Sequence, residues 1–259
     1  MRRTLSMLLA AALLATSAVH AEPAEPADPL DSPSWPDVRR KLIGDDPVVF
    51  DTRVVVLAPA VAEDSMNVPV TVSLRDIEDV RRVLVVADLN PILKVIEFEP
   101  LDAVPRISFR IKLQQGSPVR AMAQTGDGVW HVGGTWVDAA GGGCTAPSVG
   151  SSQANWSDTL GEVDARWWQR EGRGRLKFKV MHPMDTGLAP GIPAFYIERL
   201  ALRDASGRDW VRLRTFEPLS ENPLFSLEFD RPTPPLQLIG VDNNGNRIAA
   251  EVSNVGPGQ

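Results

Sequence analysis

Few residues of this chain could carry covalent or acid–base chemistry: one cysteine, Cys144, and three histidines, of which His131 and His182 lie well inside the sequence. A single cysteine excludes an internal disulfide and a cysteine-rich metal site. A cysteine nucleophile would need a histidine base and an orienting Asn or Asp. No Lys, Arg or His occurs from Val132 to Ala165, so no sequence neighbour lowers the pKa of the thiol. With an ordinary pKa near 8.5, only about a few per cent of such a thiol is ionised at pH 7.

The residues around Cys144 suggest a mechanical role. Gly141, Gly142 and Gly143 precede the cysteine, and Thr145 follows it, with no apolar periodicity that would place the thiol in a core. A free cysteine is most often a small buried hydrophobic residue, but this context predicts an exposed one. Six residues from position 138 to 143 would reach roughly 20 Å when extended, at about 3.3 Å per residue. An exposed thiol whose pKa is not lowered by neighbouring residues is typical of an attachment site that partner enzymes activate in their own active sites.

The start of the chain has the pattern of a targeting sequence. A basic Met1-Arg2-Arg3 is followed by an apolar stretch from Leu5 to Val19 and by small residues ending at Ala21. We expect residues 1–21 to be a secretory signal peptide, and residues 22–36, rich in Pro with Ala, Glu and Asp, to be a leader without its own core. The 259-residue chain has 43% apolar residues and a net charge of −6, which is typical of a folded protein and not of a basic nucleic-acid binder.

The elements that must position Cys144 are predicted to be strands. After a short helix ending at Gly44, segments rich in Val and Ile recur at the spacing of an all-β sandwich. Alternation is clearest from Ile107 to Leu113, and the turn from Thr125 to Gly128 predicts a hairpin. The expected strands of the first half are Val48–Leu57, Val68–Leu74, Val80–Ala87, Lys94–Phe98, Arg106–Leu113, Val119–Thr125 and Val129–Val137.

A second series of strands follows a region rich in Gly and Ser. These strands are expected at Leu176–Met181, Phe195–Arg203, Asp209–Thr215, Leu224–Phe229, Gln237–Asp242 and Arg247–Val252. The fold class is therefore all-β, with two immunoglobulin-like β-sandwich domains, residues 37–144 and residues 175–255, joined by a flexible linker over residues 145–174.

At this point several motifs resemble a known family. Leu42-Ile43-Gly44-Asp45, Asn67-Val68-Pro69-Val70, Ala87-Asp88-Leu89-Asn90-Pro91 and Gly142-Gly143-Cys144 are similar to the SoxY subunit of the bacterial thiosulfate-oxidising (Sox) system. Four further motifs resemble the SoxZ subunit of the same system: His182-Pro183-Met184-Asp185-Thr186-Gly187, Ile192-Pro193-Ala194-Phe195-Tyr196-Ile197, Asn222-Pro223-Leu224-Phe225 and Val241-Asp242-Asn243-Asn244-Gly245. The resemblance extends over roughly residues 40–255 and indicates a SoxY–SoxZ fusion.

The resemblance implies a periplasmic carrier that is not itself an enzyme. Cys144 would hold sulfur intermediates as covalent adducts, Gly141, Gly142 and Gly143 would form its swinging arm, and the SoxZ-like half would brace the SoxY-like half. The partners would be a Sox-type cytochrome and hydrolase. In the family the arm ends the chain, whereas here Thr145 and the second half follow. Fused carriers of this kind resemble a subgroup associated with quinoprotein dehydrogenases and cytochrome c, so the partners could instead belong to that system.

Other readings and residues stay open at the sequence level. The chain could be a non-covalent accessory module for a quinoprotein dehydrogenase and cytochrome c, and Cys144 could link two copies into a disulfide dimer. Trp167 and Trp168, beside two arginines, are candidates for partner docking or for packing of the linker, and His182 is a further docking candidate. No catalytic residue, cofactor or metal ligand is predicted, because His182 has no second ligand at a suitable spacing.

Overall fold

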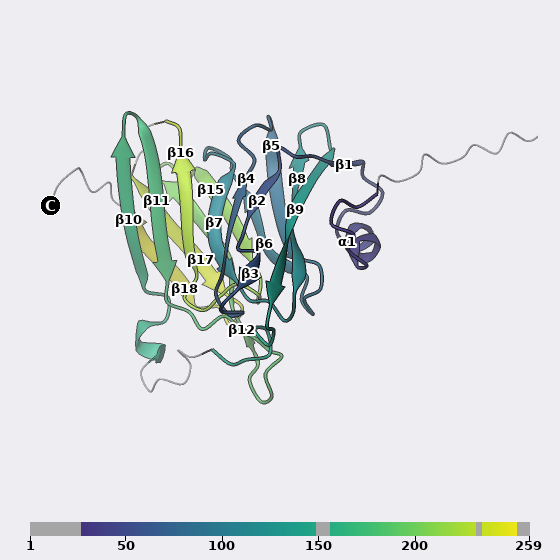
Figure 1. Ribbon diagram of the computed structural model, residues 1–259. Helices are drawn as coiled ribbons and strands as arrows, with labels where there is room; N and C mark the ends of the chain where they lie inside the picture. The colour runs from purple at the N-terminus through teal and green to yellow at the C-terminus, as the bar shows by residue number, and fades with distance from the viewer. Residues whose placement is uncertain (1–26, 149–155, 232–234, 253–259) are drawn as a thin grey trace, which may run out of the picture.

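The computed structural model describes residues 27–148, 156–231 and 235–252 and is built from two stacked β-sheets with one short α-helix (Figure 1). The all-β prediction is confirmed. The predicted signal peptide, residues 1–21, lies outside the described residues. Among the described residues, none of the helices is both long and apolar enough to cross a membrane.

The larger sheet has ten strands. Along it lie β1 (Val48–Phe50), β9 (Trp130–Ala139), β8 (Ser117–Thr125), β5 (Val80–Ala87), β6 (Lys94–Glu99), β15 (Asp209–Thr215), β14 (Ile197–Asp204), β17 (Leu236–Asp242) and β18 (Arg247–Val252), and β3 (Val61–Ala62) pairs with β9. The second sheet has six strands: β10 (Val163–Arg170), β11 (Arg173–Val180), β16 (Leu224–Phe229), β7 (Arg106–Ile111), β4 (Val68–Ser73) and β2 (Val55–Leu57). Two short strands, β12 (Asp185–Thr186) and β13 (Ala194–Phe195), pair with each other.

The two halves of the chain share both sheets. Strand β6 of the first half pairs antiparallel with β15 of the second, with Phe98 opposite Leu213. Strand β7 pairs with β16 in the same way, with Ile107 opposite Leu227. All four side chains are buried in one continuous hydrophobic core. The two expected sandwiches are therefore joined edge to edge, because each offers an unpaired strand edge that the other completes.

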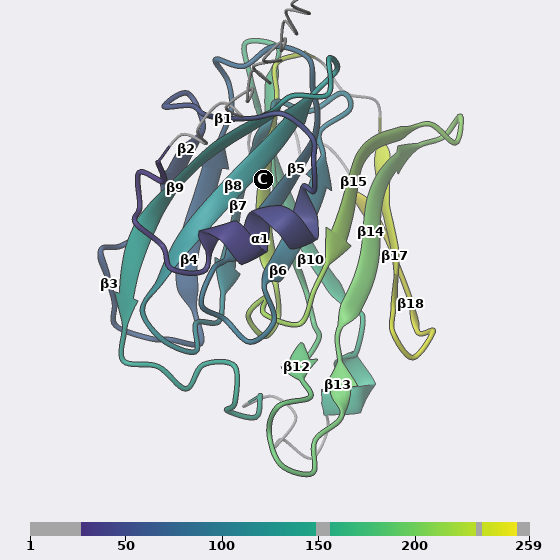
Figure 2. The same ribbon diagram turned by 90° about the vertical axis from the view of Figure 1, so that its right-hand side faces the viewer.

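The outer face of the large sheet is covered in the first half by helix α1 (Trp35–Leu42). The helix lies across the strands of this half in Figure 2. Trp35 and Val38 belong to one buried cluster with Leu84, Met122 and Trp130 of β5, β8 and β9. This burial on both faces explains the unbroken apolar run of β5, because an interior strand needs no polar face.

The predicted leader is partly wrong, because residues 27–36 have defined structure. Two guanidinium nitrogens of buried Arg120 donate to the Asp28 carboxylate at 2.7 and 2.6 Å. The Arg120 guanidinium also lies 4.6 Å from the centre of the Trp35 ring. One ion pair and one indole hold this segment, and such individual contacts are not visible in its Pro-rich composition.

Two other boundaries differ from the expectations. The expected strand Val48–Leu57 is split into β1 and β2, which belong to different sheets, at a turn where the Val54 amide donates to the Asp51 carbonyl at 3.0 Å. The expected linker, residues 145–174, contains the 3-10 helix η2 (Trp156–Thr159), all of β10 and the start of β11. Strands β10 and β11 form a hairpin whose turn is Glu171-Gly172, so the second half begins earlier than its apolar periodicity indicated.

Candidate functional site

Cys144 lies in a loop, residues 140–148, that follows β9 and that we call the Cys144 loop. The prediction of a displayed thiol is wrong for this structure: Cys144 is buried, with 0% of the residue exposed. Its Sγ donates to the Lys112 carbonyl oxygen at 3.7 Å. The residues that cover it are far away in the sequence, which is why the local glycines gave no sign of burial.

The three glycines before Cys144 dock the loop on the first half. The Gly142 amide donates to the Gln114 carbonyl at 3.1 Å and the Gly143 amide to the Leu113 carbonyl at 3.0 Å. A Cβ atom on Gly143 would lie 2.2 Å from the Ser65 carbonyl oxygen, a separation that no side chain tolerates. Gly141 and Gly142 have positive φ angles of 98° and 80°. In this structure the glycines therefore permit close backbone approach, and their predicted swinging remains a prediction.

The second half holds the same loop from the other side. The Thr186 hydroxyl donates to the Cys144 carbonyl at 2.5 Å. Further along, the Ser148 amide donates to the Asp185 carboxylate at 3.0 Å. Asp185 and Thr186 form β12, which lies at the same end of the molecule as the end of β9 (Figure 1). The Cys144 loop is thus clamped between the two halves of the chain.

A buried cation, Lys112, accompanies the thiol. Lys112 follows β7, is 0% exposed, and donates its ammonium group to the Met184 carbonyl of the second half. Burial lowers the pKa of Lys112, against the opposing effects of Asp185 and Cys144. The sequence around Cys144 showed no cation, but the fold supplies this one from 32 residues upstream. In the expected strand Arg106–Leu113 it stands at one of the alternating polar positions, which gave no sign that it is covered.

The electrostatics keep the docked thiol protonated. Burial raises the pKa of Cys144 to about 11, and the charge of Lys112 offsets only part of this effect. At pH 7 the thiolate fraction of a group with that pKa is on the order of one in ten thousand. The docked thiol is therefore a poor nucleophile and metal ligand, and covalent chemistry at Cys144 requires the loop to leave this position.

The His182 side chain is buried and is therefore not accessible to a partner protein. Its Nδ1 accepts from the Met184 amide at 3.1 Å, and its Nε2 lies 3.4 Å from the Asp242 carboxylate. Burial lowers the pKa of His182 to about 4. The predicted docking role of His182 is wrong for this conformation, because the ring supports the backbone that accepts from Lys112.

The tryptophan pair is divided by strand alternation. Trp167 is 4% exposed and stacks on Phe229 with ring centres 5.3 Å apart, whereas Trp168 is 48% exposed. Successive residues of a strand point to opposite faces of the sheet, so only one of the pair can face solvent. Trp167 is therefore not available for docking in this structure, whereas Trp168 is accessible to a partner.

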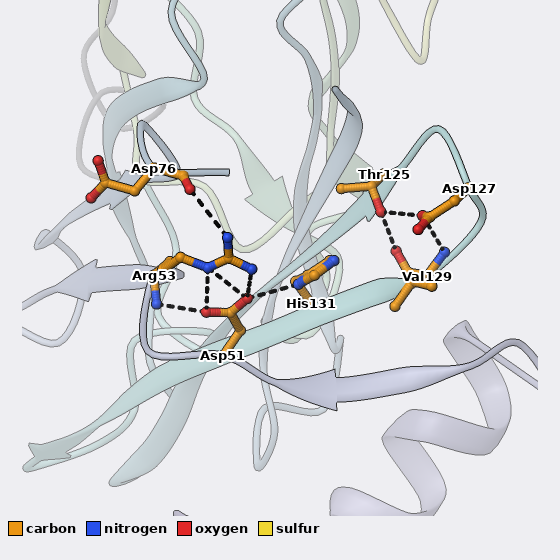
Figure 3. Close-up of polar contacts among 7 residues, drawn as sticks. All are labelled: Asp51, Arg53, Asp76, Thr125, Asp127, Val129 and His131. Carbon is orange, nitrogen blue, oxygen red and sulfur yellow. Dashed lines mark hydrogen bonds and ion pairs between the residues drawn. The ribbon is translucent and has the colours of Figure 1, made fainter. Parts of the chain in front are cut away.

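His131 belongs to a separate polar cluster (Figure 3). Its Nδ1 lies 2.8 Å from the Asp51 carboxylate, which also accepts from Arg53 at 2.7 Å. Hydrogen bonds from Arg53 lower the pKa of Asp51. Among the described residues, neither His131 nor His182 forms a hydrogen bond with the Cys144 thiol, and no cluster of three or more His, Cys, Asp or Glu side chains is placed to hold a metal ion.

Comparison with known proteins relates the first half to one family. Residues 39–144 match the family model described as "Sulfur oxidation protein SoxY", and the match ends on Cys144. Among solved structures, the sulfur carrier protein SoxY from Chlorobium limicola f thiosulfatophilum aligns at 22% identity with a TM-score of 0.36, covering 41% of this chain and 96% of that one. No curated protein matches the chain.

Proposed function

We propose that the chain is a carrier protein, not an enzyme, that holds sulfur-containing intermediates covalently on Cys144 and presents them to partner enzymes. The observation that supports this most directly is that the match to a sulfur oxidation family ends on Cys144, the chain's one thiol. A carrier needs a single thiol, because a second one nearby would displace the adduct as a disulfide.

In this proposal the Cys144 loop has a docked and an undocked state. Docking buries the thiol and keeps it protonated, which protects it from oxidation between reaction cycles. Undocking breaks the backbone hydrogen bonds of Gly142 and Gly143 and the bond from Thr186, and it returns the thiol to an ordinary pKa. Because the chain continues after Cys144, the undocked loop is held at both ends and reaches less far than a free tail.

The chemistry of loading requires a partner with redox capacity. Joining a sulfur compound R–SH to the Cys144 thiol forms an S–S bond and releases two protons and two electrons. A cytochrome-type partner would accept the electrons. Where R is a sulfonate group, as in thiosulfate, a hydrolase-type partner would add water to that group, releasing sulfate and leaving a persulfide on Cys144. The chain's own residues only present or protect the thiol. We place this cycle in the periplasm, consistent with the predicted signal peptide at residues 1–21.

The second half supports the carrier without taking part in the chemistry. It clamps the loop through Thr186 and Asp185 and accepts the Lys112 ammonium group at Met184. This is the bracing role that the resemblance to SoxZ implies. Fusion of the two halves keeps both sides of the clamp at a fixed stoichiometry.

The direct test is intact-mass spectrometry of the protein purified from cells grown on a reduced sulfur compound, with and without a thiol reductant. We expect a mass increase that reductant removes and that is absent in Cys144→Ser. An unmodified wild-type mass under these conditions would contradict the carrier proposal. Equal thermal stability of wild type and Cys144→Ser would show that the missing adduct is not caused by misfolding.

The burial of Cys144 favours one alternative, a non-covalent accessory module for a quinoprotein dehydrogenase and cytochrome c in which the thiol has no task. Under this alternative Cys144→Ser supports growth like wild type, whereas deletion of the whole protein does not. Loss of growth in both strains would exclude it. Turnover of a sulfur compound by the purified protein alone would exclude both readings in favour of a thiol enzyme.

A further inference from the structure

The outer face of the six-stranded sheet, which crosses the front of the molecule in Figure 1, carries an array of cations. Strand register places Arg166 opposite Lys177, Lys177 opposite Ser226, and Ser226 opposite Ser108, so that these side chains form one row across four strands. Neighbouring rows add more cations. We call the following set the basic face: Arg106, Arg110, Arg166, Arg175, Lys177 and Lys179.

Most of this charge is not neutralised by the protein itself. Arg106 and Arg175 both contact Glu228, each at 3.3 Å. Among the described residues, by contrast, Arg110, Arg166, Lys177 and Lys179 have no carboxylate within ion-pair distance, although the register places Asp164 opposite Lys179. Four unpaired cations on one sheet face stand out in a chain whose net charge is −6. Like charges held side by side cost stability, which an acidic partner would recover.

The same face is shaped to receive a surface. A shallow groove of about 570 Å³ runs over β11, β16, β7 and β4. Trp168 lines this groove and is 48% exposed, whereas its neighbour Trp167 is buried. Exposed Trp and Arg side chains are enriched at the centres of protein–protein interfaces. Thr71, Ser108 and Ser226 also line the groove, and the Thr71 hydroxyl donates to the Ser108 hydroxyl at 2.8 Å.

The basic face leads directly to the Cys144 loop. Arg110 and Lys112 lie on the same side of β7 and its extension, about 7 Å apart along a strand. Arg110 is exposed, and the carbonyl of Lys112 accepts from the Cys144 thiol. A partner seated over Arg110 and Lys177 would therefore lie beside the loop.

We propose that the basic face is the docking surface for an acidic patch on a partner protein, and that this contact places the partner next to the Cys144 loop. The second clause rests on the proposed carrier function, whereas the docking itself does not. A protein is favoured over a nucleic acid because an overall negative chain repels a polyanion, and the charge is confined to one sheet face. The outer face of the large sheet is less suitable: Arg203 and Arg212 there are paired with Asp209 at 2.7 and 2.8 Å, and only Arg199 and Arg247 on it are exposed without an ion-pair partner among the described residues.

The test begins with photo-cross-linking in the cell that makes the protein. The photoreactive amino acid p-benzoylphenylalanine replaces Trp168 in one variant. In the control variant it replaces Arg199, on the outer face of the large sheet. A protein cross-linked from position 168 but not from position 199 is then purified and titrated against the full chain by calorimetry. We expect the double variant Arg110→Glu/Lys177→Glu to weaken binding tenfold or more, and the affinity of wild type to fall steeply with added salt.

The matched control is Arg199→Glu/Arg247→Glu, which reverses two exposed cations that have no ion-pair partner among the described residues of the large sheet. It should stay within twofold of wild type. Equal losses in both double variants, no loss in either, or cross-links only to nucleic acid or to a second copy of the chain would overturn the proposal. No cross-link above that from position 199 would do so as well. Cys144→Ser should bind like wild type, so a failed carrier function and a failed docking surface are distinguishable.

Discussion

Two cations at the end of β7, one in the strand and one just after it, experience opposite surroundings. Arg110 is exposed and has no ion-pair partner among the described residues, whereas Lys112, two positions further on, is fully buried and donates to the Met184 carbonyl. Alternation alone would place both in solvent. The difference comes from the cover: the Cys144 loop and the segment leading into β12 close over Lys112 and stop short of Arg110.

This contrast separates a protective region from an accessible one. At the buried end, desolvation shifts the pKa values of Cys144, Lys112 and His182 away from their ordinary values, each toward the neutral form. On the basic face, charges stay solvated and available to a partner. A carrier would need both properties, since it must hold its thiol inert and still be recognised.

The largest expected effect comes from acid at the buried end. The pKa of His182 is lowered to about 4 by burial, against 6.5 in the unfolded chain, so its neutral form contributes stability that is complete above pH 6.5 and is lost as the pH falls towards 4. That contribution is at most about 3 kcal/mol. Urea unfolding at pH 7 and pH 4 should show a smaller loss in His182→Asn than in wild type. Equal losses would mean that His182 is not buried in its neutral form.

The next effect comes from preventing the loop from docking. Gly143→Ala places a Cβ 2.2 Å from the Ser65 carbonyl oxygen, which we expect to cost about 2 kcal/mol of docked state. Alkylation of Cys144 by iodoacetamide at pH 8 should then be roughly thirtyfold faster. Gly142→Ala is the control, since its Cβ meets nothing within 4 Å and suffers only from its positive φ. Slow alkylation in Gly143→Ala would contradict a docked resting thiol.

A smaller effect is expected from removing the buried charge. Lys112→Met takes away the cation that partly offsets the burial of the thiol, so the pKa of the docked Cys144 should rise further. Because alkylation proceeds from the undocked loop, its rate at pH 8 should change little. The free energy of unfolding should stay level or increase by about 1 kcal/mol, because burying an ammonium group is costly. Faster alkylation would show that Lys112 chiefly holds the loop in place.

The smallest effect is expected on the exposed side of the comparison. Arg110→Ala should change the free energy of unfolding by less than about 0.5 kcal/mol and should leave the alkylation rate of Cys144 unchanged, because the side chain is exposed and has no ion-pair partner among the described residues. Thermal unfolding and iodoacetamide kinetics check both expectations. A marked loss of stability would mean that the basic face serves the fold.

The strands of the fold were largely predictable, since their signal is local. Alternation from Ile107 to Leu113 reveals β7, and the turn residues from Thr125 to Gly128 reveal the hairpin between β8 and β9. Where the boundary depended on which sheet a segment joins, prediction failed. The stretch Val48–Leu57 reads as one apolar strand but crosses from one sheet to the other, and β10 carries too many polar residues to show a pattern.

The identity of the candidate residue, Cys144, was predictable from the sequence, but the burial of its thiol was not. That Cys144 is the candidate follows from its being the one thiol, and its isolation from cations in sequence is a fact of that sequence. Its burial depends on Ser65, Lys112 and Thr186, which come from three separate parts of the chain. The fate of the Trp167–Trp168 pair depended likewise on which face of β10 meets the core.

The sequence by itself determined the all-β class, the turns and the presence of a single thiol after three glycines, because propensity, periodicity and composition are properties of neighbouring residues. Only the tertiary structure decided that the two halves share both sheets, that the thiol is protonated and buried beside Lys112, and that unpaired cations gather on one sheet face. Desolvation and charge pairing depend on distances between residues far apart in the chain, and those distances exist only once the strands have paired.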